Sequence, residues 1–231
     1  MKPKDLISPY SWENRHTILS DGVLFVPDYY QNYDEYQFPG WDHQDIFGNN
    51  NPVRLEYCSG NGSWIVEKAM NEPDVNWVAV EIRFDRVRKI WAKKKNRGLN
   101  NLFIICGEAL TFAHHYLPDS SICEIFVNFP DPWPKDRHAK HRLIRPRFIE
   151  ENARCLKSNA MMTLVTDDEV YCTQMIDTML ENISFRSCYP EPYFITDVKD
   201  YGSSFFCNLW ENKGKTIRHM QFMCEDQESG D

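Results

Sequence analysis

The sequence lacks several features that would point to whole classes of protein. No uncharged apolar run approaches the roughly 20 residues that cross a bilayer, and no apolar segment follows the N-terminal lysines. The eight cysteines never form a CxxC pair and mostly sit inside apolar runs. We therefore expect a cytoplasmic protein with no membrane association and with reduced, buried thiols.

Charge is unevenly distributed in a chain that is acidic overall. The net charge of −8 argues by itself against a nucleic-acid partner. Residues 1–50 carry eight acidic side chains against three Lys or Arg, whereas 83–97 carry eight basic against one acidic and 135–147 carry six against one. A local basic face is therefore compatible with an acidic protein. Segment 83–97 taken alone fits a solvated helix face equally well.

The pattern from residue 53 onward predicts an α/β fold with a mostly parallel sheet, because short β-branched or aromatic runs alternate with segments of helical period. The expected strands are 53–57, 77–82, 101–106, 122–129 and 160–166, with helices between them. Segment 84–97 shows the helical period best, since its apolar residues share one stripe and Gly98 follows. We expect one domain over residues 51–224.

The flanking and C-terminal segments carry their own expectations. Residues 1–50 show no clear period and are rich in Tyr, Asp, Asn and Pro, which favours an arm packed on the core by its aromatics. Residues 203–210 and 216–224 read as an antiparallel hairpin that turns at 211–214. Residues 225–231 are expected to be a disordered acidic tail.

Polar and small residues stand directly after the predicted strands, where an open α/β sheet binds its ligands. The first strand leads from Glu56 into a turn with Gly60 and Gly62, which lets backbone amides approach a ligand closely. Glu81 ends the next strand, at the place where nucleotide-binding folds hold ribose hydroxyls, and Glu108 follows the third. No GxxxxGK[ST] phosphate loop is present, so an adenosine without a pyrophosphate fits best.

The fourth strand ends in the most informative stretch, Asn128-Phe-Pro-Asp-Pro-Trp-Pro-Lys135, followed by Asp-Arg-His-Ala-Lys-His-Arg-Leu143. Three prolines in five positions fix φ and give a rigid loop that holds Asp131 and Trp133 in place. The loop resembles the FPDPWPKKRHHKRRL signature of bacterial tRNA (guanine-N7)-methyltransferases, which modify position 46 in the variable loop. The resemblance extends over roughly residues 53–215 and includes Thr166-Asp167, similar to the family's TD signature.

The resemblance implies a Rossmann-like class I methyltransferase fold, with a mostly parallel seven-stranded sheet, a C-terminal antiparallel hairpin and helices on both faces. It implies S-adenosylmethionine as cofactor and tRNA as substrate. The implied cofactor-binding residues are Glu56, Gly60, Gly62, Glu81, Glu108 and Asp131. Asp131 is also the implied catalytic residue, with Lys135, Asp167 and Ser204 contacting the substrate.

The chemistry of N7 methylation suits these residue types. Guanine N7 already carries an in-plane lone pair, so the site needs in-line placement and stabilisation of the charge that moves onto the purine. Asp131 or Asp167 can accept hydrogen bonds from N1–H and the exocyclic amine. Lys135, Arg137, Lys140 and Arg142 can bind phosphates. Trp133 can stack on the base or pack the loop. His138 and His141 lack a third ligand nearby, so no metal is expected.

Two positions depart from the family pattern. Cys58 replaces a glycine, which costs on the order of 1 kcal/mol if φ there is positive. The family's TKFE-type element falls, by spacing to Gly214, on Ser204 to Cys207, so its glutamate is missing. Two alternatives stay open: an N6-adenine type nucleic-acid methyltransferase, and a non-catalytic tRNA-binding or adenosine-binding relative. The sequence also leaves open a monomer or a homodimer.

Overall fold

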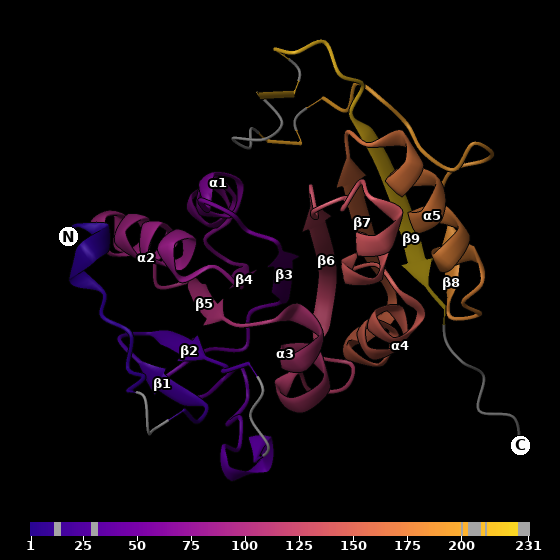
Figure 1. Cartoon of the computed structure of the whole chain (residues 1–231). Helices are drawn as coiled ribbons and strands as arrows, with labels where there is room; N and C mark the ends of the chain where they lie inside the picture. Colours follow the sequence, from indigo (N-terminus) through magenta and orange to yellow (C-terminus); the bar gives the residue numbers. More distant parts are fainter. Residues whose placement is uncertain (12–14, 29–31, 200, 203–208, 211, 226–231) are drawn as a thin grey trace, which may run out of the picture.

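The computed structural model contains one twisted sheet at the centre of the molecule (Figure 1). It describes residues 1–231 except 12–14, 29–31, 200, 203–208, 211 and 226–231. Within the described residues the sheet has nine strands in the order β1-β2-β5-β4-β3-β6-β7-β9-β8. These strands are β1 (Ile18–Ser20), β2 (Val23–Phe25), β3 (Val53–Tyr57), β4 (Asn76–Glu81), β5 (Leu102–Cys106), β6 (Ile122–Asn128), β7 (Leu156–Thr166), β8 (Phe185–Ser187) and β9 (Arg218–Cys224).

The six neighbouring strands from β2 to β7 run parallel, and the strands at both ends of the sheet run antiparallel to their neighbours. The chain builds β3, β4 and β5 outward in one direction and then returns to place β6 beside β3. The strand order reverses at this point, which opens a crevice at the carboxyl ends of β3 and β6. The predicted parallel sheet is confirmed.

Helices cover both faces of the sheet, as expected (Figure 1). The helices α1 (Ser63–Asn71) and α2 (Phe84–Arg97) pack on one face. The opposite face carries α3 (Ala109–Tyr116), α4 (Pro146–Cys155) and α5 (Glu169–Leu180). The alternation along β4 explains this division, because Trp77 and Ala79 belong to the first cluster and Val78 and Val80 to the second.

The predicted helix over 84–97 coincides with α2. Val87, Ile90 and Trp91 are buried, and Gly98 ends the helix with a left-handed backbone, φ 64°. None of the described helices is both long and apolar enough to cross a membrane. Seven of the eight cysteines lie in the described residues; all seven are free, and three are buried while Cys188 is exposed. The prediction of buried thiols is therefore only partly correct.

The expected C-terminal hairpin is wrong in its described part. The strand β9 does form, but it pairs with β7 on one side and with β8 on the other. Leu209 and Trp210 are helical rather than extended, and residues 203–208 lie outside the described part of the chain. The partner β8 has three residues, too few for the strand period to show in the sequence.

Residues 1–50 contribute two strands for which the sequence analysis made no prediction. The strands β1 and β2 form a hairpin around Asp21 and Gly22, both with positive φ, and β2 extends the parallel sheet beyond β5. Leu24, Val26, Trp41 and Ile46 join the core on the side of α3. These four residues therefore belong to the core, and part of the segment belongs to the sheet itself.

Candidate active site

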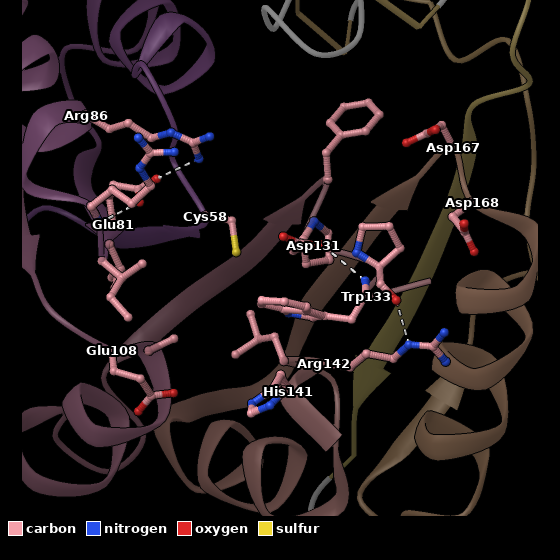
Figure 2. Close-up of a pocket in the computed structure, with 18 of the residues that line it drawn as sticks. Cys58, Glu81, Arg86, Glu108, Asp131, Trp133, His141, Arg142, Asp167 and Asp168 are labelled. Carbon is pink, nitrogen blue, oxygen red and sulfur yellow. Dashed lines mark hydrogen bonds and ion pairs between the residues drawn. The ribbon is translucent and has the colours of Figure 1, made fainter. Parts of the chain in front are cut away.

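A cavity of about 780 Å³ opens where the strand order reverses (Figure 2). Glu81 and Arg86 lie on one side of it, Asp167 and Asp168 on the other, with Asp131 and Trp133 between them. The wall also includes Cys58, the start of α3 at Gly107 to Ala109, the loop from Phe129 to Pro134, and Trp210 and Lys215 from the segment before β9. The cavity thus collects residues from five strand ends.

The glycine turn after β3 closes one side of this region. Cys58, Gly60 and Gly62 all have positive φ, of 60°, 55° and 69°. A Cβ at Gly62 would lie 2.7 Å from Cγ1 of Ile90, so α2 requires glycine at that position. Cys58 therefore places a side chain where the backbone favours glycine, which is the condition under which the sequence analysis expects a cost. Burial raises the pKa of its thiol well above the ordinary value, so the thiol stays protonated.

Glu81 joins the glycine turn to the start of α2. Its carboxylate accepts hydrogen bonds from the backbone N–H groups of Gly60 and Arg83, both at 2.8 Å, and lies 3.7 Å from the Arg86 guanidinium. Burial raises the pKa of Glu81, and these donors oppose the rise. A carboxylate held by backbone donors on both sides keeps a fixed orientation at the cavity wall.

Glu108 and Glu56 have different surroundings. Glu108 lines the cavity and also caps α3, because the N–H and hydroxyl of Thr111 donate to it at 2.6 and 2.8 Å. Glu56 is 2% exposed and is not among the lining residues. Its Oε1 accepts a hydrogen bond from Asn128 at 2.8 Å, and burial raises its pKa to about 7.

The proline-rich loop leaves β6 with a strained backbone. Phe129 and Trp133 both precede a proline and both have positive φ, 49° and 43°. Asp131 is exposed and accepts a hydrogen bond from the Trp133 N–H at 3.1 Å (Figure 2). The Trp133 ring lies 5.3 Å from that of His141 and 5.8 Å from that of His138. The loop therefore projects a carboxylate and an aromatic ring into the cavity.

Arg142 holds this loop from behind. Its Nε donates to the Pro132 carbonyl at 2.7 Å (Figure 2). Its guanidinium lies 5.0 Å from the ring centre of buried Tyr171. The Tyr171 hydroxyl in turn accepts from the Ile144 N–H at 3.1 Å. Arg142 is thus tied to the loop backbone, whereas the sequence analysis expected it to bind a phosphate.

The far wall of the cavity combines an acid, a base and an aromatic ring. Asp167, with 11% of its side chain exposed, forms an ion pair with Lys215. The Lys215 ammonium lies 4.3 Å from the ring centre of Trp210, a cation–π contact. Asp168 caps α5 by accepting from the Tyr171 N–H at 2.7 Å. Of the two acids on this wall, Asp167 is therefore the one that pairs directly with a cation.

The structure brings together some of the predicted site residues and separates others. Those that line the cavity are Glu81, Glu108, Asp131, Arg142 and Asp167. Gly60 and Gly62 form the turn beside it, Glu56 lies buried, and Lys135, Arg137 and Lys140 are exposed beyond it, on or next to the short helix at Asp136–His141. Ser204 lies outside the described residues. Among the described residues, no cluster of His, Cys, Asp or Glu has the makeup of a metal site.

Sequence reasoning missed Arg86, Trp210 and Lys215 as cavity residues. Arg86 stands in the first turn of α2, directly after Glu81, and could have been found from that position. Trp210 and Lys215 reach the cavity because β9 returns antiparallel to β7. The predicted hairpin placed Trp210 in a strand and so obscured this.

The basic segment 83–97 contributes to internal contacts as well as to the surface. Arg88 donates to the Leu6 carbonyl at 2.8 Å, and Lys93 donates to Asn61 and Ser63. Burial lowers the pKa of Lys94 to about 8. Several basic side chains of α2 therefore make internal contacts, unlike those of the simple solvated face that was one of the two interpretations, and residues 135–147 are the more accessible basic segment.

The sheet order and the site at its reversal define a class I methyltransferase fold, and similar solved structures agree. A 16S rRNA (adenine(1408)-N(1))-methyltransferase from Catenulisporales acidiphilia matches with a TM-score of 0.58 at 15% identity, over 80% of this chain and 90% of that one. TrmN from Thermus thermophilus matches with a TM-score of 0.55 at 13% identity, over 75% of this chain and 45% of that one. At these identities the likeness concerns the fold.

The sequence comparisons identify the family. Residues 50–220 match the family model described as "Putative methyltransferase". The tRNA (guanine-N(7)-)-methyltransferase of Chlamydia muridarum is 48% identical, over 96% of this chain and 98% of that protein. The protein of the same description from Rubrobacter xylanophilus is 31% identical, over 81% and 83%. The chain belongs to the tRNA (guanine-N7)-methyltransferase family.

Proposed function

We propose that this chain transfers a methyl group from S-adenosylmethionine to N7 of the guanine at position 46 in the variable loop of tRNA. The observation that carries the proposal is the position of Asp131, which lies in one cavity with Glu81 on its first side and Asp167 on its far side. Family membership supplies the reaction class, and this arrangement supplies a place for both reactants.

The residues on the Glu81 side fit an adenosine with a sulfonium group. The cavity volume lies in the range that small-molecule sites occupy. The glycine turn allows close approach of a ligand to the backbone, and Glu81 is a fixed acceptor for ribose hydroxyls. Glu108 follows β5, where an adenine amine can donate a hydrogen bond to its carboxylate. S-adenosylmethionine, when bound here, supplies an electrophilic methyl group.

The residues on the far side suit a guanine. Asp131 and Asp167 offer carboxylates that accept from N1–H and the exocyclic amine, which orients the ring and stabilises positive charge on it. Trp133 and Trp210 offer aromatic faces for stacking. N7 already carries the lone pair that would form the new bond to the methyl group, with no proton to remove first, so the protein contributes placement and charge stabilisation rather than proton removal.

The exposed cations beyond the cavity suit the tRNA backbone. Lys135, Arg137 and Lys140 lie directly after the catalytic loop, the loop from Phe129 to Pro134 that carries Asp131. All three are exposed. Phosphate contacts at these positions would fix the register of the RNA over the cavity. With tRNA as substrate, the proposed site of action is the cytoplasm.

The experiment is incubation with labelled S-adenosylmethionine and unmodified tRNA, followed by nucleoside mass spectrometry. We expect label in 7-methylguanosine. Label in N6-methyladenosine would contradict the proposal in favour of an exocyclic-amine methyltransferase. Measurable cofactor binding without label would contradict it in favour of a non-catalytic relative.

Asp131→Asn tests the proposed catalytic residue, because it keeps the side-chain shape and removes the charge. We expect kcat to fall by about 10²–10³, the usual loss when one group that stabilises charge in the transition state is removed. The dissociation constant of S-adenosylmethionine, measured by calorimetry, separates a loss of turnover from a loss of cofactor binding. Wild-type turnover by the variant would contradict the assignment.

A further inference from the structure

Asn128, the last residue of β6, stands three residues before Asp131 and is 4% exposed. Both ends of its side-chain amide are in use. Its Nδ2 donates to Oε1 of Glu56 at 2.8 Å, and its Oδ1 accepts from the Tyr201 hydroxyl at 2.7 Å. A buried amide held at both ends has a single orientation, so Asn128 is a fixed point at the base of the catalytic loop.

The backbone directly after Asn128 needs such a fixed point. Phe129 has φ 49° and precedes a proline, a strained combination that persists only where the surroundings hold it. The Phe129 N–H donates to the Val165 carbonyl at 2.9 Å, which holds the backbone on the side of β7. The Asn128 side chain holds it on the opposite side, through Glu56 of β3.

Tyr201 is itself firmly placed. Its carbonyl accepts from Nε1 of buried Trp64 at 2.7 Å, and its ring lies 5.4 Å from the Trp64 ring and 4.7 Å from that of His219. The next residue, Gly202, approaches Trp64 so closely that a Cβ would lie 3.1 Å from the indole. Tyr201 therefore anchors the C-terminal segment on α1 while its hydroxyl reaches Asn128.

We propose that Tyr201, acting through Asn128, is a positioning residue that couples the C-terminal segment to the Asp131 loop. The chain beyond Tyr201 continues to Trp210 and Lys215, which line the cavity opposite Glu81. The hydrogen bond from the Tyr201 hydroxyl thus connects the start of the C-terminal segment with Asn128, at the base of the loop that supplies the carboxylate, and the bond to Glu56 fixes Asn128 on β3. A shift of either would move Asp131 relative to the base. The kinetic test rests on the proposed function.

Tyr201→Phe is the first test, because it removes the hydroxyl and keeps the ring and the carbonyl contact with Trp64. We expect kcat on tRNA to fall at least tenfold, since small misplacements of reacting groups cost that much or more. The dissociation constant of S-adenosylmethionine should stay near that of the wild type, whereas the melting temperature should fall, because the buried Asn128 Oδ1 loses its donor. Unchanged kcat would overturn the proposal.

Tyr116→Phe is the matched control. The Tyr116 hydroxyl donates to the Tyr33 carbonyl at 2.9 Å and lies 2.6 Å from the Thr17 hydroxyl, away from the cavity. Its removal should lower the melting temperature and leave kcat unchanged. An equal fall of kcat in both variants would overturn the proposal, because the loss would then reflect general stability.

A double-mutant cycle tests the route through Asn128. If Tyr201 acts through Asn128, Tyr201→Phe combined with Asn128→Ala should lower kcat no further than Asn128→Ala alone. If the double variant instead shows the product of the two single-variant reductions in kcat, Tyr201 does not act through Asn128.

Hydrogen exchange separates this proposal from the proposed function. Exchange in the 129–135 peptide should be faster in Tyr201→Phe than in the wild type and unchanged in Tyr116→Phe. This readout needs no turnover, so it decides the coupling even if the wild type fails to methylate tRNA. Equal exchange in all three proteins would overturn the coupling.

Discussion

Cys58 shows the effect of one residue on the backbone of the cofactor turn. Its φ of 60° is one that L side chains adopt at a cost of about 1–2 kcal/mol. Cys58→Gly should therefore be more stable than Cys58→Ala by about 1 kcal/mol, because both variants lose the thiol and only glycine relieves the strain. Urea unfolding of the two variants measures the difference, and a more stable alanine variant would contradict the account.

Glu56 gives a second prediction, for pH dependence. Its pKa is about 7 in the folded protein against an ordinary 4.5, so the folded state keeps a proton that the unfolded chain releases. This stabilisation is complete below pH 4.5 and is lost as pH rises through 7, in total about 3 kcal/mol. Relative to Glu56→Gln, the wild type should lose about this much free energy of unfolding between pH 4.5 and 8. A constant difference would contradict the prediction.

The sequence could predict which residues lie at the cavity edge of the sheet wherever the order of the parallel strands alone decides their position. Glu81 ends one parallel strand, Glu108 and Asp131 follow two others, and the topology brings all three to one edge. Glu56 precedes its strand end by one residue, which places it inside the sheet rather than on the cavity wall. Arg142 looked like a phosphate ligand from its basic neighbours, and only the three-dimensional contact with Pro132 reveals its attachment to the loop.

The loop from Phe129 to Pro134 and the segment behind it form the element that the account depends on most. Arg142→Ala removes the contact with the Pro132 carbonyl and should lower kcat by about tenfold or more, with little change in the salt dependence of tRNA binding. Lys140→Ala, an exposed control in the same segment, should leave kcat near wild type and reduce the salt slope by about 0.7–0.9. Titrations from 50 to 200 mM salt test both. The reverse pattern would contradict these roles.

The C-terminal element was mispredicted because its sequence period is ambiguous. The apolar and aromatic residues of 203–210 favour a strand in the sequence; residues 203–208 lie outside the described part of the chain, and the described neighbour β8 is only three residues long. The pairing of β9 with β7 over six residues comes from the sheet as a whole rather than from a local signal. For this reason the sequence did not predict that Trp210 and Lys215 line the cavity.

At the scale of the whole molecule, residues 1–50 contribute two short strands to the sheet, Ile18–Ser20 and Val23–Phe25. A DG turn between two short apolar runs is a recognised hairpin signal, and Asp21-Gly22 between Ile18–Ser20 and Val23–Phe25 carries it. The surrounding polar composition hid it. The fold of residues 53–166 was predictable because the elements there are long and periodic.

Leu24 tests how far this hairpin contributes to the common core. The side chain is fully buried in β2, so Leu24→Ala should lower the free energy of unfolding by about 2–5 kcal/mol in a single cooperative transition. Half-buried Leu19 of β1 is the matched control, and Leu19→Ala should cost clearly less. Urea unfolding measures both. A separate early transition in Leu24→Ala would mean that the segment unfolds independently.

The central proposal is that this cavity binds both reactants and that the protein methylates N7 of a single guanine. Chemical cleavage of the product tests it most directly. Borohydride reduction and aniline treatment break an RNA chain at 7-methylguanosine. After incubation with the protein and S-adenosylmethionine, a tRNA transcript with guanine at position 46 should be cut there, and a transcript with adenine at 46 should stay intact. Scission at another guanine, or none in either transcript, would contradict the claim.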